Sequence, residues 1–131
     1  MTPASLTTTA LDRAIASKVV WLTTLRADGS PHTTPVWFVL DGAVLSIVTG
    51  ESNIKIRNLR GDPRVSVAME GSAAVPLVAE GTAQVIEMAR VSDALAQSFA
   101  LKYKGWDIRD HTVDGPRVVA EIRIHRWLMG N

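Results

Sequence analysis

The sequence predicts a mostly β fold: a small antiparallel barrel of six strands with two or three helices packed around it. Two features lead to this prediction. Short runs rich in β-branched and aromatic residues alternate with turns that contain Gly, Asp and Pro, which is typical of hairpins. The first three runs are joined by so few residues that no crossover helix fits between them, and this disfavours a parallel α/β sheet.

The first half of the chain is expected to form a helix followed by a three-stranded meander. Thr9, with Asp12 three positions later, is a typical helix start and predicts an amphipathic helix over residues 9–17. Strands are expected over residues 19–25, 32–40 and 44–49, with hairpin turns at residues 27–30 and 41–42. The second strand is apolar on both faces, so one face should cover the core. The other should be covered by a helix, a ligand or a second subunit.

The second half is expected to contain two more helices and three more strands. Ser52 or Asn53 can cap a short helix, which Gly61 and Pro63 should end. Gly81 is a candidate β-bulge inside one of the strands. Strands are expected over residues 64–70, 76–86 and 117–127, a helix over residues 88–103, and a loop over residues 104–115.

Composition and charge exclude several classes of protein. The chain has 131 residues, so residues 1–131 are expected to form a single domain at about 100–200 residues per domain. Its 47% hydrophobic and 21% charged residues exclude a disordered chain. Lys and Arg number 14 against 13 Asp and Glu, so a net charge of +1 gives no global attraction to nucleic acid or to an anionic membrane.

The absence of cysteine excludes disulfides, thiolate metal sites and a cysteine nucleophile. The first residues show no signal-peptide pattern, and no apolar stretch approaches the about 20 residues that span a bilayer. We therefore expect a cytoplasmic protein with neither a membrane nor a nucleic acid as its partner.

The stretch over residues 48–60 is the best candidate for a binding site. A strand end is followed by hydroxyl and amide side chains and then by a short basic helix. A helix N-terminus presents free N–H groups and partial positive charge, and with hydroxyl donors it can bind a phosphate group. The alternative is an ordinary capped surface helix with solvated charges. The candidate residues are Thr49, Ser52, Asn53, Lys55, Arg57 and Arg60.

A second candidate feature lies in the second expected strand, at Thr34, Pro35, Val36 and Trp37. Proline removes a ladder donor, so it indicates an edge strand or a bulge, whose free backbone groups can meet the edge of a flat ring system. Trp37 is large enough to form a wall of such a pocket. The alternative, that the tryptophan simply packs in the core, is the commoner arrangement.

No other motif predicts catalysis. His32, His111 and His125 are scattered and have no second ligand at metal-binding spacing, so no metal site is expected. The sequence has no nucleophile elbow, Walker motif or dinucleotide fingerprint. If the protein is an enzyme, a bound cofactor should therefore carry the reaction.

Four segments, taken in order, resemble one known family. They are residues 22–38 (LTTLRADGSPHTTPVWF), 49–50 (TG), 55–65 (KIRNLRGDPRV) and 80–83 (EGTA). The sequence is similar to the pyridoxamine 5′-phosphate oxidase-like split β-barrel superfamily, and within it to the branch of flavin/deazaflavin oxidoreductases that uses coenzyme F420. The resemblance is dense over residues 19–85 and looser up to the C-terminal strand.

The resemblance implies a homodimer of six-stranded split barrels with a cofactor site at each side of the interface. It places the cofactor phosphate on Lys55 and Arg57, with help from residues 49–53, and the tricyclic ring against residues 34–37. It further implies that Trp127 of the partner subunit, or the partner's Arg126, closes the site. Many relatives carry Gly-Ser-Arg where this chain has Ser-Asn-Ile at residues 52–54, so Arg57 or Arg60 is expected to replace the missing basic contact.

The activity implied by the resemblance is hydride transfer from reduced F420 to a conjugated organic acceptor, with broad specificity. One alternative is that the barrel uses FMN, and another is that it binds a flavin or deazaflavin without turnover. Oxidation of pyridoxamine phosphate itself is disfavoured, because residues 123–125 (RIH) match that enzyme's substrate cluster poorly.

Overall fold

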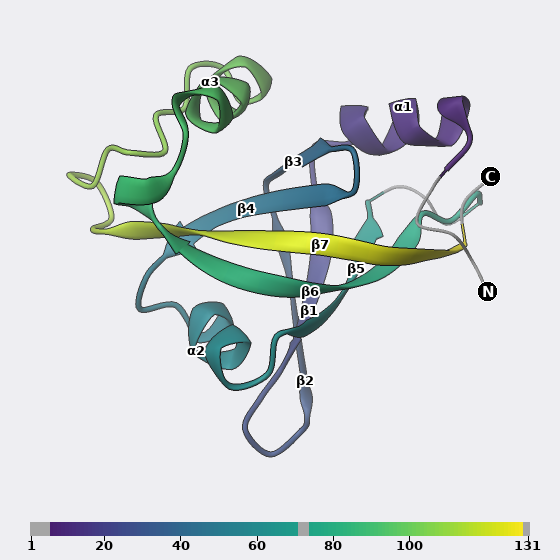
Figure 1. Cartoon of the computed structure of the whole chain (residues 1–131), viewed down its shortest axis with the longest axis horizontal. Coiled ribbons are helices and arrows are strands. Elements are labelled where there is room, and N and C mark those ends of the chain that lie inside the picture. Colours follow the sequence, from purple (N-terminus) through teal and green to yellow (C-terminus); the bar gives the residue numbers. More distant parts are fainter. Residues whose placement is uncertain (1–5, 71–73, 130–131) are drawn as a thin grey trace.

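A computed structural model describes residues 6–70 and 74–129 and shows one antiparallel sheet of seven strands with helices around it. The strands follow the order β2-β1-β5-β6-β7-β4-β3 across the sheet, which curls around a core as a half-barrel (Figure 1). The helices are α1 (Thr8–Ala16), α2 (Ile54–Gly61) and α3 (Asp93–Lys102), with a short 3₁₀ segment η1 (Met88–Arg90) before α3. The strands are β1 (Val20–Leu25), β2 (Pro31–Val36), β3 (Phe38–Asp41), β4 (Val44–Gly50), β5 (Arg64–Met69), β6 (Val78–Glu87) and β7 (Arg117–Met129).

The single strand expected over residues 32–40 is two strands, so the meander is wrong and the strand count is seven rather than six. β2 pairs with β1, with Val36 opposite Val20, whereas β3 pairs with β4, with Phe38 opposite Ile47. The chain therefore changes partners at Trp37, and β2 and β3 lie at opposite ends of the strand order. The Tyr103 hydroxyl accepts a hydrogen bond from the Phe38 N–H at 2.9 Å, which satisfies a backbone donor at this bend.

Smaller differences occur at the ends of the other elements. The first helix is capped by Thr7, whose hydroxyl accepts a hydrogen bond from the Ala10 N–H at 3.2 Å, so Thr9 lies inside the helix. The helix expected over residues 88–103 is interrupted, because Ser92 caps α3 by accepting from the Leu95 N–H at 3.1 Å. The bulge expected at Gly81 is confirmed by a register shift between β6 and β7 at that residue.

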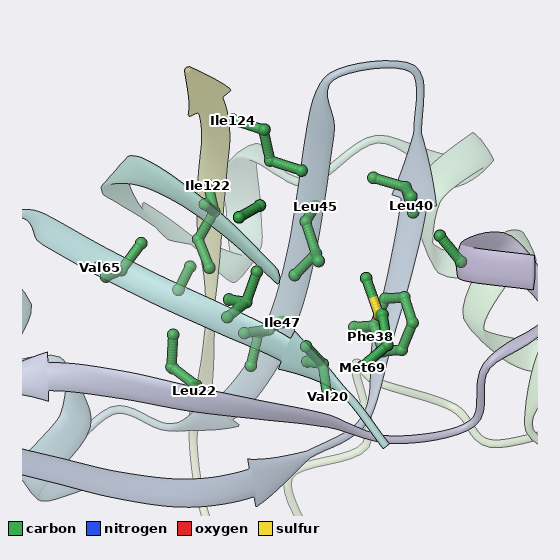
Figure 2. Close-up of a cluster of buried hydrophobic side chains, with 14 of the residues drawn as sticks. Val20, Leu22, Phe38, Leu40, Leu45, Ile47, Val65, Met69, Ile122 and Ile124 are labelled. Atoms are coloured by element: carbon green, nitrogen blue, oxygen red, sulfur yellow. The ribbon is translucent and has the colours of Figure 1, made fainter. Parts of the chain in front are cut away.

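Two hydrophobic clusters cover opposite faces of β4 and β7. The main cluster fills the inside of the curled sheet, where Phe38, Leu45 and Ile47 are completely buried (Figure 2). The second lies under α3 and includes Phe99 and Val119. Of the three covers expected for the outer apolar face, a helix is thus present over part of it. No helix within residues 6–70 and 74–129 is long and apolar enough to cross a membrane.

Candidate functional site

The short helix α2 is held against the sheet by a buried polar contact. Asn53 caps it, accepting a hydrogen bond from the Lys55 N–H at 3.0 Å. Farther along, the Asn58 side-chain amide donates to the Thr24 hydroxyl of β1 at 3.0 Å, and both residues are buried. Ile56 and Leu59 are also buried, so this face of α2 packs toward β1 and β6 (Figure 1).

Lys55 belongs to the packed face of α2 and has no counterion. Residues three apart lie on the same side of a helix, so Lys55 shares the side of Asn58 that faces β1. Its side chain is partly buried, and the loss of hydration lowers the pKa of its ammonium group below the usual range. In the described parts of the chain, no carboxylate forms an ion pair with it.

The neighbouring strand β2 turns unsatisfied polar atoms toward the same side of the sheet. His32 and Thr34 lie opposite Thr24 and Leu22 of β1, and these β1 residues face the core. The hydroxyl oxygen of Thr34 and Nδ1 of His32 are buried without a hydrogen-bond partner. Buried polar atoms are nearly always paired, so two orphans on one strand face indicate a missing ligand or water.

We group Lys55 of α2 with Thr34 and His32 of β2, the strand paired with the β1 that α2 contacts, and call this group the α2–β2 polar site. Lys55 and Thr34 were expected from the sequence, whereas His32 was counted only as a scattered histidine. The signal that could have found it is the two-residue period of a strand, which places His32 on the same face as Thr34.

The other expected phosphate ligands lie around this site rather than in it. Thr49 is partly buried at the end of β4, and Ser52 is exposed in the turn that follows. The Asn53 side chain is engaged in capping the helix. Arg57 and Arg60 are exposed, and their positions in the helix turn them away from Lys55. The structure thus brings together one cation from α2, not three.

The residues expected to contact a ring do not form one surface. Val36 points into the main cluster, whereas Pro35 is exposed on the opposite face of β2. Trp37 stacks on Tyr103, with ring centroids 4.5 Å apart, and is 47% exposed. The expected edge position of β2 is confirmed, so its outer backbone groups are free of sheet partners.

The residues proposed to close a partner's site are occupied within their own chain. Trp127 is only 4% exposed and belongs to the main cluster. Arg126 forms an ion pair with Glu80 at 2.8 Å. Trp127 is thus buried in its own chain, and Arg126 is exposed but ion-paired within it.

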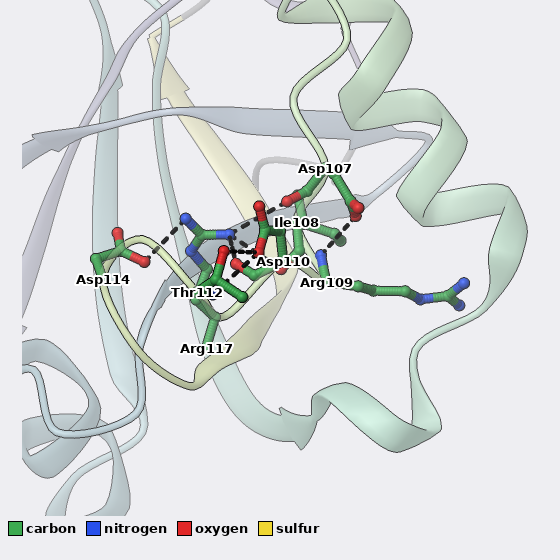
Figure 3. Close-up of polar contacts among 7 residues, drawn as sticks. All are labelled: Asp107, Ile108, Arg109, Asp110, Thr112, Asp114 and Arg117. Carbon is green, nitrogen blue, oxygen red and sulfur yellow. Dashed lines mark hydrogen bonds and ion pairs between the residues drawn. The ribbon is translucent and has the colours of Figure 1, made fainter.

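A buried arginine supports the turn that leads into α2. The Arg117 guanidinium, whose side chain is 8% exposed, donates to the carbonyl oxygens of Asp107 and Asp110 at 3.2 and 2.7 Å (Figure 3). It also forms an ion pair with Asp114 at 2.9 Å. Beside it, the Pro116 carbonyl accepts a hydrogen bond from the Glu51 N–H at 3.0 Å, so this loop fixes the start of the α2 turn.

The α2–β2 polar site fits an anionic group. It offers one partly desolvated ammonium group without a counterion, one hydroxyl and one imidazole nitrogen. Each of these groups can donate a hydrogen bond to a phosphate oxygen. No group of three or more acidic or histidine residues able to hold a metal ion occurs in the part of the chain that the structure describes. The site can therefore hold a phosphorylated molecule, while the chemistry must come from that molecule.

A family model described as pyridoxamine 5′-phosphate oxidase matches residues 7–129, nearly the whole chain. The chain belongs to this family. The antiparallel half-barrel with its flanking helices is the fold shared by pyridoxamine 5′-phosphate oxidase-like proteins.

Solved structures of pyridoxamine 5′-phosphate oxidase-like proteins have the same fold. A conserved hypothetical protein from Mycobacterium tuberculosis is 25% identical, with a TM-score of 0.76 over 97% of this chain and 86% of that one. An F420 reductase is 21% identical, with a TM-score of 0.69 over 88% of this chain and 94% of its own. The heme storage protein HutZ from Vibrio cholerae is 19% identical, with a TM-score of 0.69 over 92% of both chains.

Proposed function

We propose that this protein is a homodimeric oxidoreductase that binds coenzyme F420 and transfers hydride to a conjugated organic acceptor. One observation carries the proposal: the partly buried ammonium of Lys55 has no counterion in the described chain, lies on the helix side that faces β1, and is accompanied by an unpaired Thr34 hydroxyl on β2, the strand paired with β1. Family membership and the F420 reductase among the structural neighbours support it.

The residues of the site would bind and orient the cofactor. Lys55 and Thr34 would bind phosphate oxygens, and His32 would donate a further hydrogen bond through its free ring nitrogen. Thr49 and Ser52 are further donors at the turn. Arg57 and Arg60 would attract the anionic tail of the cofactor from the surface, an effect that salt should weaken.

The ring is proposed to lie along the free edge of β2, between Thr34 and the exposed face of Trp37. When bound, reduced F420 supplies the hydride. The aromatic wall would keep water from the reacting carbon and hold the acceptor over the ring. We assign no protein acid, and the proton that completes the reduction would come from water.

A direct titration separates this proposal from its alternatives. The purified protein is titrated with F420, FMN and hemin, and binding is followed by cofactor fluorescence or absorbance. F420 should bind most tightly, and reduced F420 should be oxidised when enones or quinones are added. Tight binding of FMN or hemin with no binding of F420 would overturn the choice of cofactor. Binding of F420 without turnover across a broad acceptor panel would favour a storage or carrier protein.

Replacing Lys55 tests the site itself. Lys55→Met keeps the apolar stem of the side chain and removes the charge, so F420 affinity should fall by about 10- to 100-fold, the worth of a charged hydrogen bond of about 1.5–3 kcal/mol. Lys104→Met removes the same charge from an exposed position outside the site and should change the affinity less than about twofold. Equal affinities for the parent and Lys55→Met would place the phosphate elsewhere.

A further inference from the structure

A cavity lies between α1, β3 and α3. Its volume is about 430 Å³, and Ile15, Val39, Leu40 and Leu101 provide its apolar walls. None of the residues of the α2–β2 polar site lines it. Its size falls within the about 300–1,000 Å³ of small-molecule pockets.

Lys102, which lines this cavity, carries a charge that no carboxylate in the described part of the chain neutralises. Its Nζ is buried and has no hydrogen-bond partner. It lies 3.7 Å from the centroid of the Phe38 ring, and Phe38 is completely buried. In the described chain no carboxylate forms an ion pair with Lys102. Burial and the charge of Lys18 lower the pKa of Lys102 to about 8.

Lys18 brings a second positive charge to the same cavity. Its Nζ donates to the Lys102 carbonyl at the end of α3 at 3.2 Å, and both lysines line the cavity. No acid is among the lining residues, and α1, β3 and α3 bear theirs, Asp12, Asp41 and Asp93, on exposed positions outside it. The cavity therefore combines apolar walls with two cations and no counterion.

Two large apolar side chains that line the cavity are exposed to water, which indicates a ligand with an apolar part. Leu101 is 80% exposed and Ile15 is 43% exposed, although both are large and hydrophobic. A small inorganic anion would leave these side chains in water, and a neutral hydrocarbon would leave the buried ammonium unpaired. A molecule with one anionic end and an apolar body satisfies both.

We propose that this cavity binds a small monocarboxylic acid with an apolar body, such as a medium-chain fatty acid or an aryl carboxylate. The carboxylate pairs with Lys18 and with Lys102, whose ammonium turns from the Phe38 ring toward the cavity, and the apolar body packs between Ile15 and Leu101. No residue lining the cavity belongs to the proposed cofactor site, although Tyr103 connects the two: it stacks on Trp37, and Lys18 and Lys102 lie over its ring.

Octanoate and octanol are a matched pair of probes, because they share the alkyl chain and differ in charge. Calorimetric titration of the full chain without cofactor should show octanoate binding at least about tenfold tighter than octanol, the worth of a hydrogen-bonded charge pair. Octanoate affinity should fall as pH rises through about 8 to 10, because Lys102 then loses its proton. Equal affinity for the two probes would overturn the proposal.

Variants locate the site. Lys102→Met should weaken octanoate binding about tenfold or more and leave octanol binding unchanged, whereas the surface control Lys104→Met should do neither. Circular dichroism and the thermal midpoint verify that both variants fold. Unchanged octanoate affinity in Lys102→Met would contradict the assignment.

Leu101→Asp separates a ligand site from a surface that a second copy covers. If the cavity binds a small carboxylic acid, this variant keeps its oligomeric state and loses octanoate affinity. If it instead dissociates the protein and octanoate never binds the parent, the face is a subunit contact and the proposal fails.

Discussion

The hydrogen bond between Asn58 and Thr24 is the polar contact that holds α2 in place beside the proposed phosphate site. Both residues are buried, so removing one partner leaves the other unsatisfied in the core. Asn58→Leu or Thr24→Val alone should lower the free energy of unfolding by about 1–3 kcal/mol, while the double variant should lose less than the sum. Urea denaturation of all four proteins measures this coupling.

If the losses in the free energy of unfolding of the two single variants add up to that of the double variant, the Asn58–Thr24 hydrogen bond contributes nothing to stability. Because Lys55 lies on the same face of α2, Asn58→Leu should also weaken F420 binding in a folded protein, and Thr24→Val should do so less. This would connect the packing of the helix to the proposed cofactor site.

At the scale of the elements, Gly81 is a position where β6 and β7 leave no room for a side chain. A Cβ placed there would collide with the Arg123 carbonyl oxygen, which is backbone and cannot move aside alone. Gly81→Ala should therefore lower the free energy of unfolding by about 1–3 kcal/mol. Gly61→Ala, at the end of α2 where a Cβ meets no atom within 4 Å, should be neutral or raise it by about 0.4–1 kcal/mol.

Thermal and urea unfolding of these two variants measure the difference. If the Gly81→Ala protein is as stable as Gly61→Ala, β6 and β7 can move apart at Gly81 without lowering the free energy of unfolding. The comparison isolates the packing of the bulge, because both variants make the same chemical change.

Local sequence signals predicted most elements and the two hairpins, β1 with β2 and β3 with β4, but not where each hairpin lies in the sheet. The bulge at Gly81 and the edge position of β2 followed from glycine and proline, whose backbone chemistry acts within one residue. The change of partner at Trp37 did not, because residues 32–40 keep one extended, apolar pattern through it. That bend is stabilised by Tyr103, which is 65 residues away from Phe38 in sequence, so no local pattern reveals it.

The same distinction applies to the candidate site. Lys55 and Thr34 were predictable because helix starts and edge strands have recognisable residues. The exposure of Arg57 depends on which face of α2 packs against the sheet, and the burial of Trp127 depends on the register of β7. Both are properties of the assembled sheet rather than of the local sequence. Charge alone could not rank Lys55 above its two arginine neighbours.

At the scale of the whole molecule, an apolar row crosses the outer face of the sheet. Pro35 lies opposite Trp21, Trp21 opposite Ala68, and Ala68 opposite Val78, while the residues next to them in β1, β5 and β6 face the core. Trp21 is 41% exposed in the single chain. Such a row on an outer face is the kind of surface that a second subunit covers.

If the proposed homodimer uses this row, Trp21 should be central to it. Trp21→Glu places a charge in the interface and should weaken the dimer by about 2 kcal/mol or more, which is about 30-fold in the dissociation constant. Sedimentation velocity should then show a concentration-dependent shift toward the monomer that the exposed control Leu101→Glu does not cause. Because Pro35 of the row directly follows Thr34 of the proposed cofactor site, the Trp21→Glu monomer should also bind F420 more weakly. A monomeric variant with the parent's F420 affinity would mean that one chain holds the whole cofactor site.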